Sequence, residues 1–167
     1  MAHRYLTGMM ALVLALATSC GEKRMAKDGY LPEGTVVMTV EGPRRIETVG
    51  PGAQVVSFND AEANVDFATV KKLYASEIST VQRIELESGV SLTVRKDKRV
   101  LNLAYGSWSR VNQMHKGDEV MYLNEMGEPS RSVVSRVVPQ NLSYPVRVYG
   151  LELDKKQGIF ANDILLR

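Results

Sequence analysis

Cysteine and histidine are almost absent from this sequence of 167 residues, which contains one cysteine and two histidines. A single cysteine cannot form a disulfide within the chain, so the fold must be held by its hydrophobic core. His115 has no second histidine or cysteine near it in the sequence, which argues against a zinc site. We therefore expect no metal and no other cofactor.

The sequence also lacks an excess of charge of either sign. Lys and Arg number 21 against 19 Asp and Glu, and the net charge is +2. Domains that bind nucleic acids concentrate basic residues to neutralise phosphates. This balance therefore predicts no nucleic-acid partner.

Apolar runs are short except at the N-terminus, MAHRYLTGMMALVLALATSC. The run from Leu6 to Ala17 is shorter than the roughly 20 apolar residues that cross a bilayer as a helix. Arg4 gives the segment a basic start, and the small residues Thr18 and Ser19 follow the apolar run. This order is typical of an export signal that is removed.

Cys20 stands directly after those small residues, and the arrangement resembles the lipobox of bacterial lipoproteins. The resemblance implies removal of residues 1–19, lipid on Cys20 and a membrane-anchored protein on the extracytoplasmic side of the bacterial cell envelope. The commonest lipobox has leucine where this chain has Ala17. The alternative is a plain cleaved signal with an incidental cysteine, but a free thiol is a liability in an oxidising compartment.

The rest of the chain predicts a tether and one domain. Residues 20–29 are polar and without periodicity, which is typical of a short linker. Residues 30–167 suffice for one hydrophobic core.

From Thr35 onward, short runs of Val, Ile, Leu and Tyr alternate with Gly, Pro, Asn and Asp, which predicts an all-β fold. Residues 81–94 predict a hairpin. Residues 60–77 are ambiguous between helix and strand, and we expect a strand over 67–74 because of its β-branched residues. The other expected strands cover 35–40, 53–58, 119–123, 132–138, 146–153 and 159–167, the last with a turn at Asn162-Asp163.

Four stretches, taken in order, resemble the Hint module of inteins, hedgehog autoprocessing domains and bacterial toxin-associated proteins. They are YLPEGTVVMTVEGPRRIETVGPGAQVVSF (30–58), VQRIELESGVSLTVRKDKRV (81–100), Trp108 with HKGDEVMYL (115–123), and VYGLELDKKQGIFANDILLR (148–167). The resemblance spans essentially the whole domain and implies the Hint fold, a compact β fold of many short strands and tight turns. Its scaffold positions persist as Gly34, Thr35, Gly117, Asp118, Phe160, Ala161 and Asn162.

Hint modules act by an acyl shift, in which a Cys or Ser at the first residue attacks the preceding peptide carbonyl. The resemblance places Tyr30 there, and a phenol oxygen at the far end of a rigid ring cannot reach that carbonyl. The family's Thr and His of the second block fall on Arg95 and Lys98. Its internal and penultimate His of the last block fall on Gln157 and Arg167, and the terminal Asn would follow Arg167. We call Tyr30, Arg95, Lys98, Gln157 and Arg167 the five matched positions.

Substitution at all five matched positions implies that no catalytic residue is kept. We expect a non-enzymatic binding or scaffold module with an unidentified protein partner in the envelope. An alternative is residual or altered amide-bond chemistry by Lys98 and Asp97, which requires a lowered pKa of Lys98. A third is a part of a larger envelope assembly, which a broad exposed apolar patch would favour.

Three further expectations concern exposure, packing and backbone conformation. Residues 95–99, RKDKR, are expected to form a solvated turn, as runs of charge commonly do. Tyr105 and Trp108 are expected to pack into the core. Asp163 occupies a turn position where the family has glycine, so we expect a positive φ there.

Overall fold

The computed structural model describes residues 30–167, so the expected signal (1–19), Cys20 and the tether (20–29) lie outside the described residues. In the described part, the chain forms strands, two single-turn 3₁₀ helices and no α-helix. The strands are β1 (Leu31–Pro32), β2 (Val36–Thr39), β3 (Gly42–Arg45), β4 (Gln54–Asn59), β5 (Asn64–Leu86), β6 (Ser91–Val94), β7 (Arg99–Asn102), β8 (Ser107–Arg110), β9 (Glu119–Leu123), β10 (Pro129–Leu153), β11 (Gly158–Ala161) and β12 (Ile164–Leu166). The 3₁₀ helices are η1 (Ile46–Thr48) and η2 (Val111–Gln113). No helix of residues 30–167 has the length and apolarity to cross a membrane.

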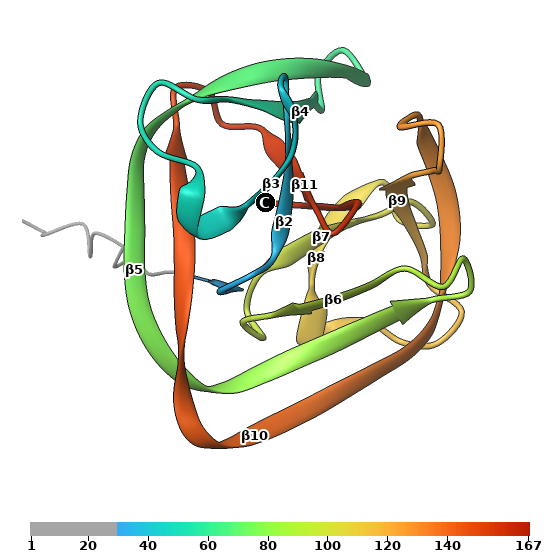
Figure 1. Cartoon of the computed structure of the whole chain (residues 1–167). Helices are drawn as coiled ribbons and strands as arrows, with labels where there is room; N and C mark the ends of the chain where they lie inside the picture. The colour runs from blue at the N-terminus through green and yellow to red at the C-terminus, as the bar shows by residue number, and fades with distance from the viewer. Residues whose placement is uncertain (1–29) are drawn as a thin grey trace, which may run out of the picture.

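Two long strands form the frame of the domain. β5 has 23 residues and β10 has 25, and they pair antiparallel over most of their length. Figure 1 shows them running side by side along two edges of the domain and bending together at one corner. Four β10 residues, 142–145, lie in an irregularity at this bend, between the pairs Asn141↔Thr80 and Val146↔Ile78. A bulge of this kind bends a strand without ending it.

The two ends of this frame hold the remaining strands. The first part of β5 pairs with β4, and the first part of β10 pairs with β9. The order β1-β10-β5-β4-β2-β11-β12-β9-β7-β8 completes the sheet, with β3 on β2 and β6 on β5. The main core fills the interior with fully buried side chains such as Leu31, Val37, Ile84, Leu92 and Leu166.

A second, smaller cluster lies on the other face of the sheet. Phe58, Phe160, Leu123 and Leu165 form it, and the half-buried Trp108 is among the residues that pack against it. Trp108 therefore packs, as expected, whereas Tyr105 is 75% exposed and the expectation that it packs was wrong. Tyr105 lies in the tip of the β7–β8 hairpin, where no neighbouring element covers it.

The C-terminal hairpin is joined to the start of the domain by one side chain. Asn162 and Asp163 form the turn between β11 and β12 with φ of 41° and 63°, so the predicted turn and the positive φ of Asp163 are confirmed. The Asn162 side-chain oxygen accepts a hydrogen bond from the Val36 backbone N–H at 2.8 Å. Its amide nitrogen donates to the Ser91 carbonyl at 3.3 Å.

The structure confirms the all-β prediction, the 81–94 hairpin and the strand expected over 67–74. It corrects the expectation of short strands throughout, because the runs at 67–74 and 81–86 belong to β5 and those at 132–138 and 146–153 to β10. The strands β3, β7 and β8 were not expected. Their charged and small residues, as in GPRR and SWSR, lack the apolar alternation from which a strand is predicted.

Gly158 is the glycine on which the packing of Trp108 depends. A Cβ atom there would lie 2.7 Å from Trp108 Cη2 and 2.8 Å from a Leu165 methyl group. We predict that Gly158→Ala lowers the free energy of unfolding by about 1–3 kcal/mol, the usual cost of overpacking. Chemical denaturation measures this change.

Gly50 provides the matched control, because an added Cβ at Gly50 meets nothing within 4 Å. Gly50→Ala should leave the free energy of unfolding unchanged or raise it slightly, since alanine restricts the unfolded chain. Equal losses of stability in the two variants would contradict the packing role of Gly158.

Candidate functional site

Tyr30 is the first residue that the structure describes, and it is held by backbone hydrogen bonds and by burial of its side chain. Its backbone N–H donates to the Tyr149 carbonyl of β10 at 2.9 Å, and its carbonyl accepts from the Arg95 N–H at 3.0 Å. The side chain is 9% exposed. Burial raises the pKa of its phenol to about 12, against the smaller lowering effects of a backbone hydrogen bond at Leu151 and of the Arg95 charge. The hydroxyl is therefore held, protonated, at the backbone of β10.

Lys98 covers the ring of Tyr30. Its ammonium nitrogen lies 3.5 Å from the ring centroid, in the geometry of a cation–π interaction. Burial, with a contribution from the positive charge of Arg95, lowers the pKa of Lys98 to about 8, while Asp97 acts in the opposite direction. Residues 95–98 do form a turn, but Lys98 is half-buried, so the expectation that the whole turn is solvated was wrong.

Asp97 pairs with Arg95 and not with Lys98. The Arg95 Nε and Nη2 atoms donate to the two carboxylate oxygens of Asp97 at 2.6 and 2.9 Å. Burial would raise the pKa of Asp97, but the hydrogen bonds and the charge of Arg95 outweigh it and hold that pKa below its ordinary value. The carboxylate is therefore ionised and engaged, which leaves it poorly suited to take a proton from Lys98.

Gln157 lies away from this cluster, in a network between β4 and β5. Its Oε1 accepts from the Ser57 hydroxyl at 2.7 Å, and its Nε2 donates to Asp66 at 3.0 Å. Lys155 donates to the same Asp66 oxygen at 2.8 Å. These hydrogen bonds, those of Lys155 first, hold the pKa of Asp66 well below its usual range. Gln157 thus fastens the segment before β11 to the sheet.

Arg167 is near the cluster only through its backbone. It exchanges two backbone hydrogen bonds with Arg99, the residue after Lys98. Its guanidinium lies elsewhere, 2.8 Å from an Asp60 oxygen and 5.5 Å from the Trp108 ring centroid. The same Asp60 oxygen accepts from Trp108 Nε1 at 2.7 Å. The five matched positions therefore divide into one cluster, Tyr30, Arg95 and Lys98, and two separate groups.

The partners of Gln157 and Arg167 were not found in the sequence. Asp66 is 91 residues from Gln157, and Asp60 is 107 residues from Arg167. No local spacing signals such pairs, because the pairing of β4, β5 and β11 brings them together. Within residues 30–167, the structure contains no group of three or more His, Cys, Asp and Glu side chains that could hold a metal ion.

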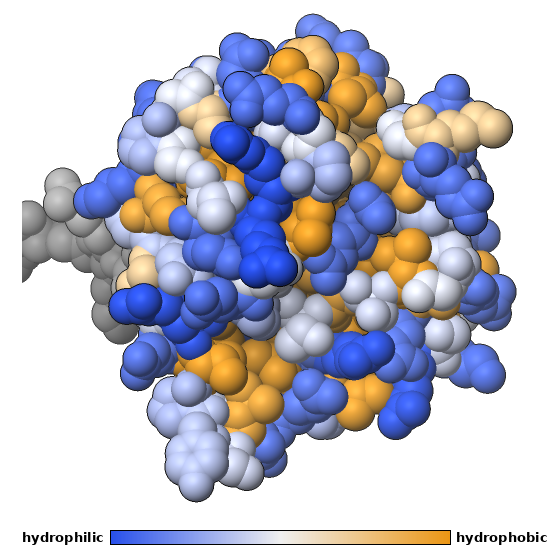
Figure 2. All heavy atoms as spheres, viewed as in Figure 1, coloured by the Kyte–Doolittle hydropathy of each residue, from blue (hydrophilic) through white to orange (hydrophobic). Residues whose placement is uncertain are grey.

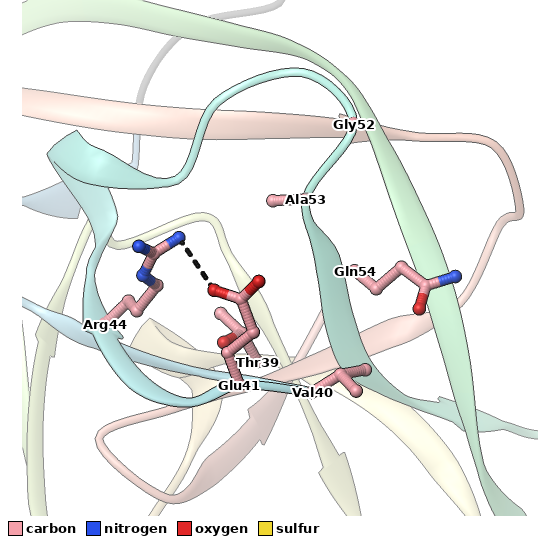
Figure 3. A pocket seen from close by; sticks show the side chains of 7 residues that line it. All are labelled: Thr39, Val40, Glu41, Arg44, Gly52, Ala53 and Gln54. Carbon is pink, nitrogen blue, oxygen red and sulfur yellow. Dashed lines mark ion pairs between the residues drawn. The ribbon is translucent and has the colours of Figure 1, made fainter.

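A surface pocket of about 220 Å³ lies between the β2–β3 turn and the start of β4 (Figure 3). Its charged residues are Glu41 and Arg44, which form an ion pair at 3.3 Å. Both side chains are largely exposed, at 75% and 48%. A solvated pair of this kind has ordinary surface chemistry, and the pocket holds none of the five matched positions.

Solved structures of intein-type domains are similar to this chain. An intein-like domain from the bacterium Clostridium thermocellum matches 83% of this chain and 98% of its own length, with a TM-score of 0.72 and 21% identity. A DnaB intein from Synechocystis matches 83% and 97%, with a TM-score of 0.72 and 13% identity. A DnaX mini intein from Spirulina platensis matches 83% and 98%, with a TM-score of 0.70 and 13% identity. At the level of sequence, no family profile and no curated protein matches.

The domain has the Hint fold. The likeness extends over nearly the full length of each of these domains, so the expected fold is confirmed. At such low identities the likeness concerns the fold alone. The chemistry open to this Hint domain therefore depends on its own residues.

The titration of Tyr30 and Lys98 predicts a maximum of stability in alkaline solution. The folded pKa of Lys98, about 8, lies below its ordinary value of 10.5, so the free energy of unfolding should rise by up to about 3 kcal/mol as the pH increases across that interval. The folded pKa of Tyr30, about 12, lies above its ordinary value of 10.0. The free energy of unfolding should therefore fall as the pH increases from about 10 to about 12.

Chemical denaturation across this pH range tests both the rise and the fall of the free energy of unfolding. Lys98→Met should remove the rise, and Tyr30→Phe should remove the fall that begins near the ordinary tyrosine pKa. Lys96, an exposed residue of the same turn, provides the control. If Lys96→Met changes the profile as Lys98→Met does, the burial of Lys98 is not its cause.

Proposed function

We propose that this protein is a lipid-anchored lipoprotein on the extracytoplasmic side of the bacterial envelope, and that its Hint domain has lost self-cleavage and binds another protein. Four features support this proposal: the signal-like N-terminal sequence, Cys20, the Hint fold and the tyrosine at position 30. The observation that carries the loss of cleavage is the environment of Tyr30.

An acyl shift needs a nucleophile that folds back onto the preceding carbonyl. The Tyr30 hydroxyl is held at the backbone of Leu151 instead, and its raised pKa keeps it protonated at neutral pH. The ring packs directly under the Lys98 ammonium, so that the side chain nearest to this amine is an aromatic ring without a nucleophile at its face. Leu31, its neighbour, is fully buried and carries no nucleophile.

The other members of the cluster also support the proposal. Arg95 is bound by Asp97 and remains charged, so it is unsuited to general acid–base chemistry at neutral pH. Gln157 has no titratable group, and its hydrogen bonds go to Ser57 and Asp66. The arrangement is that of a packed structural core with interacting charges, which is compatible with a binding module.

One observation favours altered amide-bond chemistry as the second candidate. The pKa of Lys98, about 8, leaves a small fraction of its amine neutral at neutral pH. The pairing of Asp97 with Arg95 counts against the proposed Lys98–Asp97 pair. The amine also faces an aromatic ring and not a peptide carbonyl.

A role within a larger assembly has less support. The large apolar residues that are most exposed, Met126, Tyr144 and Tyr105, lie on three different turns or bends. On the face seen in Figure 2, apolar residues are interspersed with polar ones. This distribution favours contacts of limited area over a broad permanent interface.

The loss of cleavage predicts a constant mass. The purified protein, incubated with an excess of thiol at neutral pH, should keep its intact mass, because no thioester forms before Tyr30. A product beginning at Tyr30 would contradict the proposal. If that product appeared in the wild type and not in Lys98→Met, it would favour the Lys98 chemistry.

The lipid anchor predicts membrane association that depends on Cys20. Cys20→Ala should move the protein from the membrane fraction to the soluble or unprocessed fraction and abolish acyl-chain mass on the N-terminal peptide. Ser19→Ala retains a small residue before the cysteine and should leave both unchanged. An unmodified Cys20 in the mature wild type would contradict the anchor.

A further inference from the structure

β8 is an edge strand whose outer side has no neighbour in residues 30–167. It pairs with β7 alone, through Arg99↔Arg110, Val100↔Ser109, Leu101↔Trp108 and Asn102↔Ser107. A strand edge of this kind exposes a row of backbone N–H and C=O groups to which another chain can pair. Which residues expose them follows from the hydrogen-bond pattern.

The Val111 N–H donates to the Lys98 carbonyl at 2.8 Å, which makes Lys98 and Val111 a hydrogen-bonded pair. Hydrogen-bonded pairs alternate along an antiparallel ladder, so Val100 and Ser109 form the next one. Arg99 confirms this alternation, because its N–H and C=O bond to Arg167 on the other side, at 3.2 and 2.8 Å. The backbone groups of Trp108 and Arg110 therefore point away from β7.

Two arginine side chains meet at the end of this edge. Arg99 and Arg110 are directly opposite each other in a non-hydrogen-bonded pair, the closer of the two pair types. Both are exposed, and neither forms an ion pair within the described chain. Like charges directly opposite on neighbouring strands destabilise a sheet. An acidic group placed beside Arg110 would relieve that repulsion.

An apolar hollow lies two residues away on the same face. Trp108, opposite Leu101, helps to line a cavity of about 290 Å³ whose other walls include Phe58, Leu103 and Met121. Its one charged lining residue, Asp60, is already bonded to Trp108 and Arg167. The cavity is open to one apolar side chain of ordinary size. Because side chains at positions i and i+2 of a strand share a face, Trp108 and Arg110 present an apolar site and a basic site at that spacing.

We propose that β8 binds an extended peptide segment of a partner protein as an added β-strand. The peptide carries an apolar residue beside Trp108 and, two positions away, an acidic residue beside Arg110. Its backbone pairs with the outward N–H and C=O groups of Trp108 and with the outward N–H of Arg110, whose carbonyl begins the 3₁₀ helix η2, as in other cases of β-strand addition. This inference rests on the proposed function as a binding module and names the class of partner.

The first experiment separates the backbone contact from the charge. The φ of Arg110 is −69°, which proline adopts without strain, and its N–H does not bond to β7. Arg110→Pro therefore removes one outward donor and leaves the fold intact, and Arg110→Ala removes the charge alone.

The probe is a fluorescent peptide of threonines that carries one Leu and one Glu two positions apart, and its binding is measured by fluorescence anisotropy. We expect Arg110→Pro to bind the peptide more weakly than Arg110→Ala by about tenfold.

Amide hydrogen exchange of the wild type gives an independent readout. The peptide should slow exchange at the Trp108 and Arg110 amides, which point away from β7, and leave the Ser107 and Ser109 amides, which point toward β7, little changed. Equal binding by the proline and alanine variants, or no slowing at Trp108 and Arg110, would overturn the proposal.

The second experiment tests the charge. Arg110→Glu should weaken binding of the Leu-Glu peptide by at least about tenfold and improve binding of the matching Leu-Lys peptide. Arg136 is an exposed arginine on β10 that lies directly opposite an acidic residue, Glu85 of β5, and is far along the chain from the Trp108 cavity, so Arg136→Glu is the control and should change neither. If the wild type binds neither peptide while its mass stays intact in thiol, strand addition fails and the loss of self-cleavage stands.

Discussion

The pairing of β5 with β10 is the contact on which the rest of the domain depends. The first part of each strand also pairs with a further neighbour, β5 with β4 and β10 with β9, so their shared register fixes where β4 and β9 begin their own pairings. A slip of one residue would exchange the buried and exposed sides of both strands. The alternation Val134, Val148 and Ile84 inward against exposed Arg136 and Arg147 resists such a slip. β1 pairs with β10, and this pairing sets Tyr30 against Tyr149 and the turn after β6.

The position of Tyr30 between β10 and the turn after β6 explains why the cluster of Tyr30, Arg95 and Lys98 is tightly packed. A position at the start of a domain is usually free to move, but both backbone groups of Tyr30 are bonded and its ring is closed over by Lys98. The cost of burying an amine is offset in part by the electron-rich ring face. The result is a packed cluster in which Arg95 is paired with Asp97 and Lys98 lies on the Tyr30 ring.

The sequence predicted much of the fold because the signals involved are local. Apolar alternation and turn residues located most of the strands, and the order of four stretches pointed to the Hint fold. Prediction from the sequence failed where the contact that determines the structure joins residues far apart in the chain. Lys98 in a run of charges has the appearance of a surface residue, and only the return of β1 beside β6 places Tyr30 beneath it. Similarly, SWSR carries no strand pattern, and β8 exists because it completes a hairpin with β7.

The bonds between Asn162 and Val36 connect residues that are 126 positions apart in the chain. Until the C-terminal hairpin is available, β2 lacks its neighbour β11, and the core around Val37 and Ala161 stays open. Native contacts of such long range form late and slowly, because the loop between them must close first. Folding of this topology therefore waits for nearly the whole polypeptide. Loss of the last hairpin would therefore be felt at the beginning of the domain, where β2 and its buried Val37 depend on β11 for a neighbour.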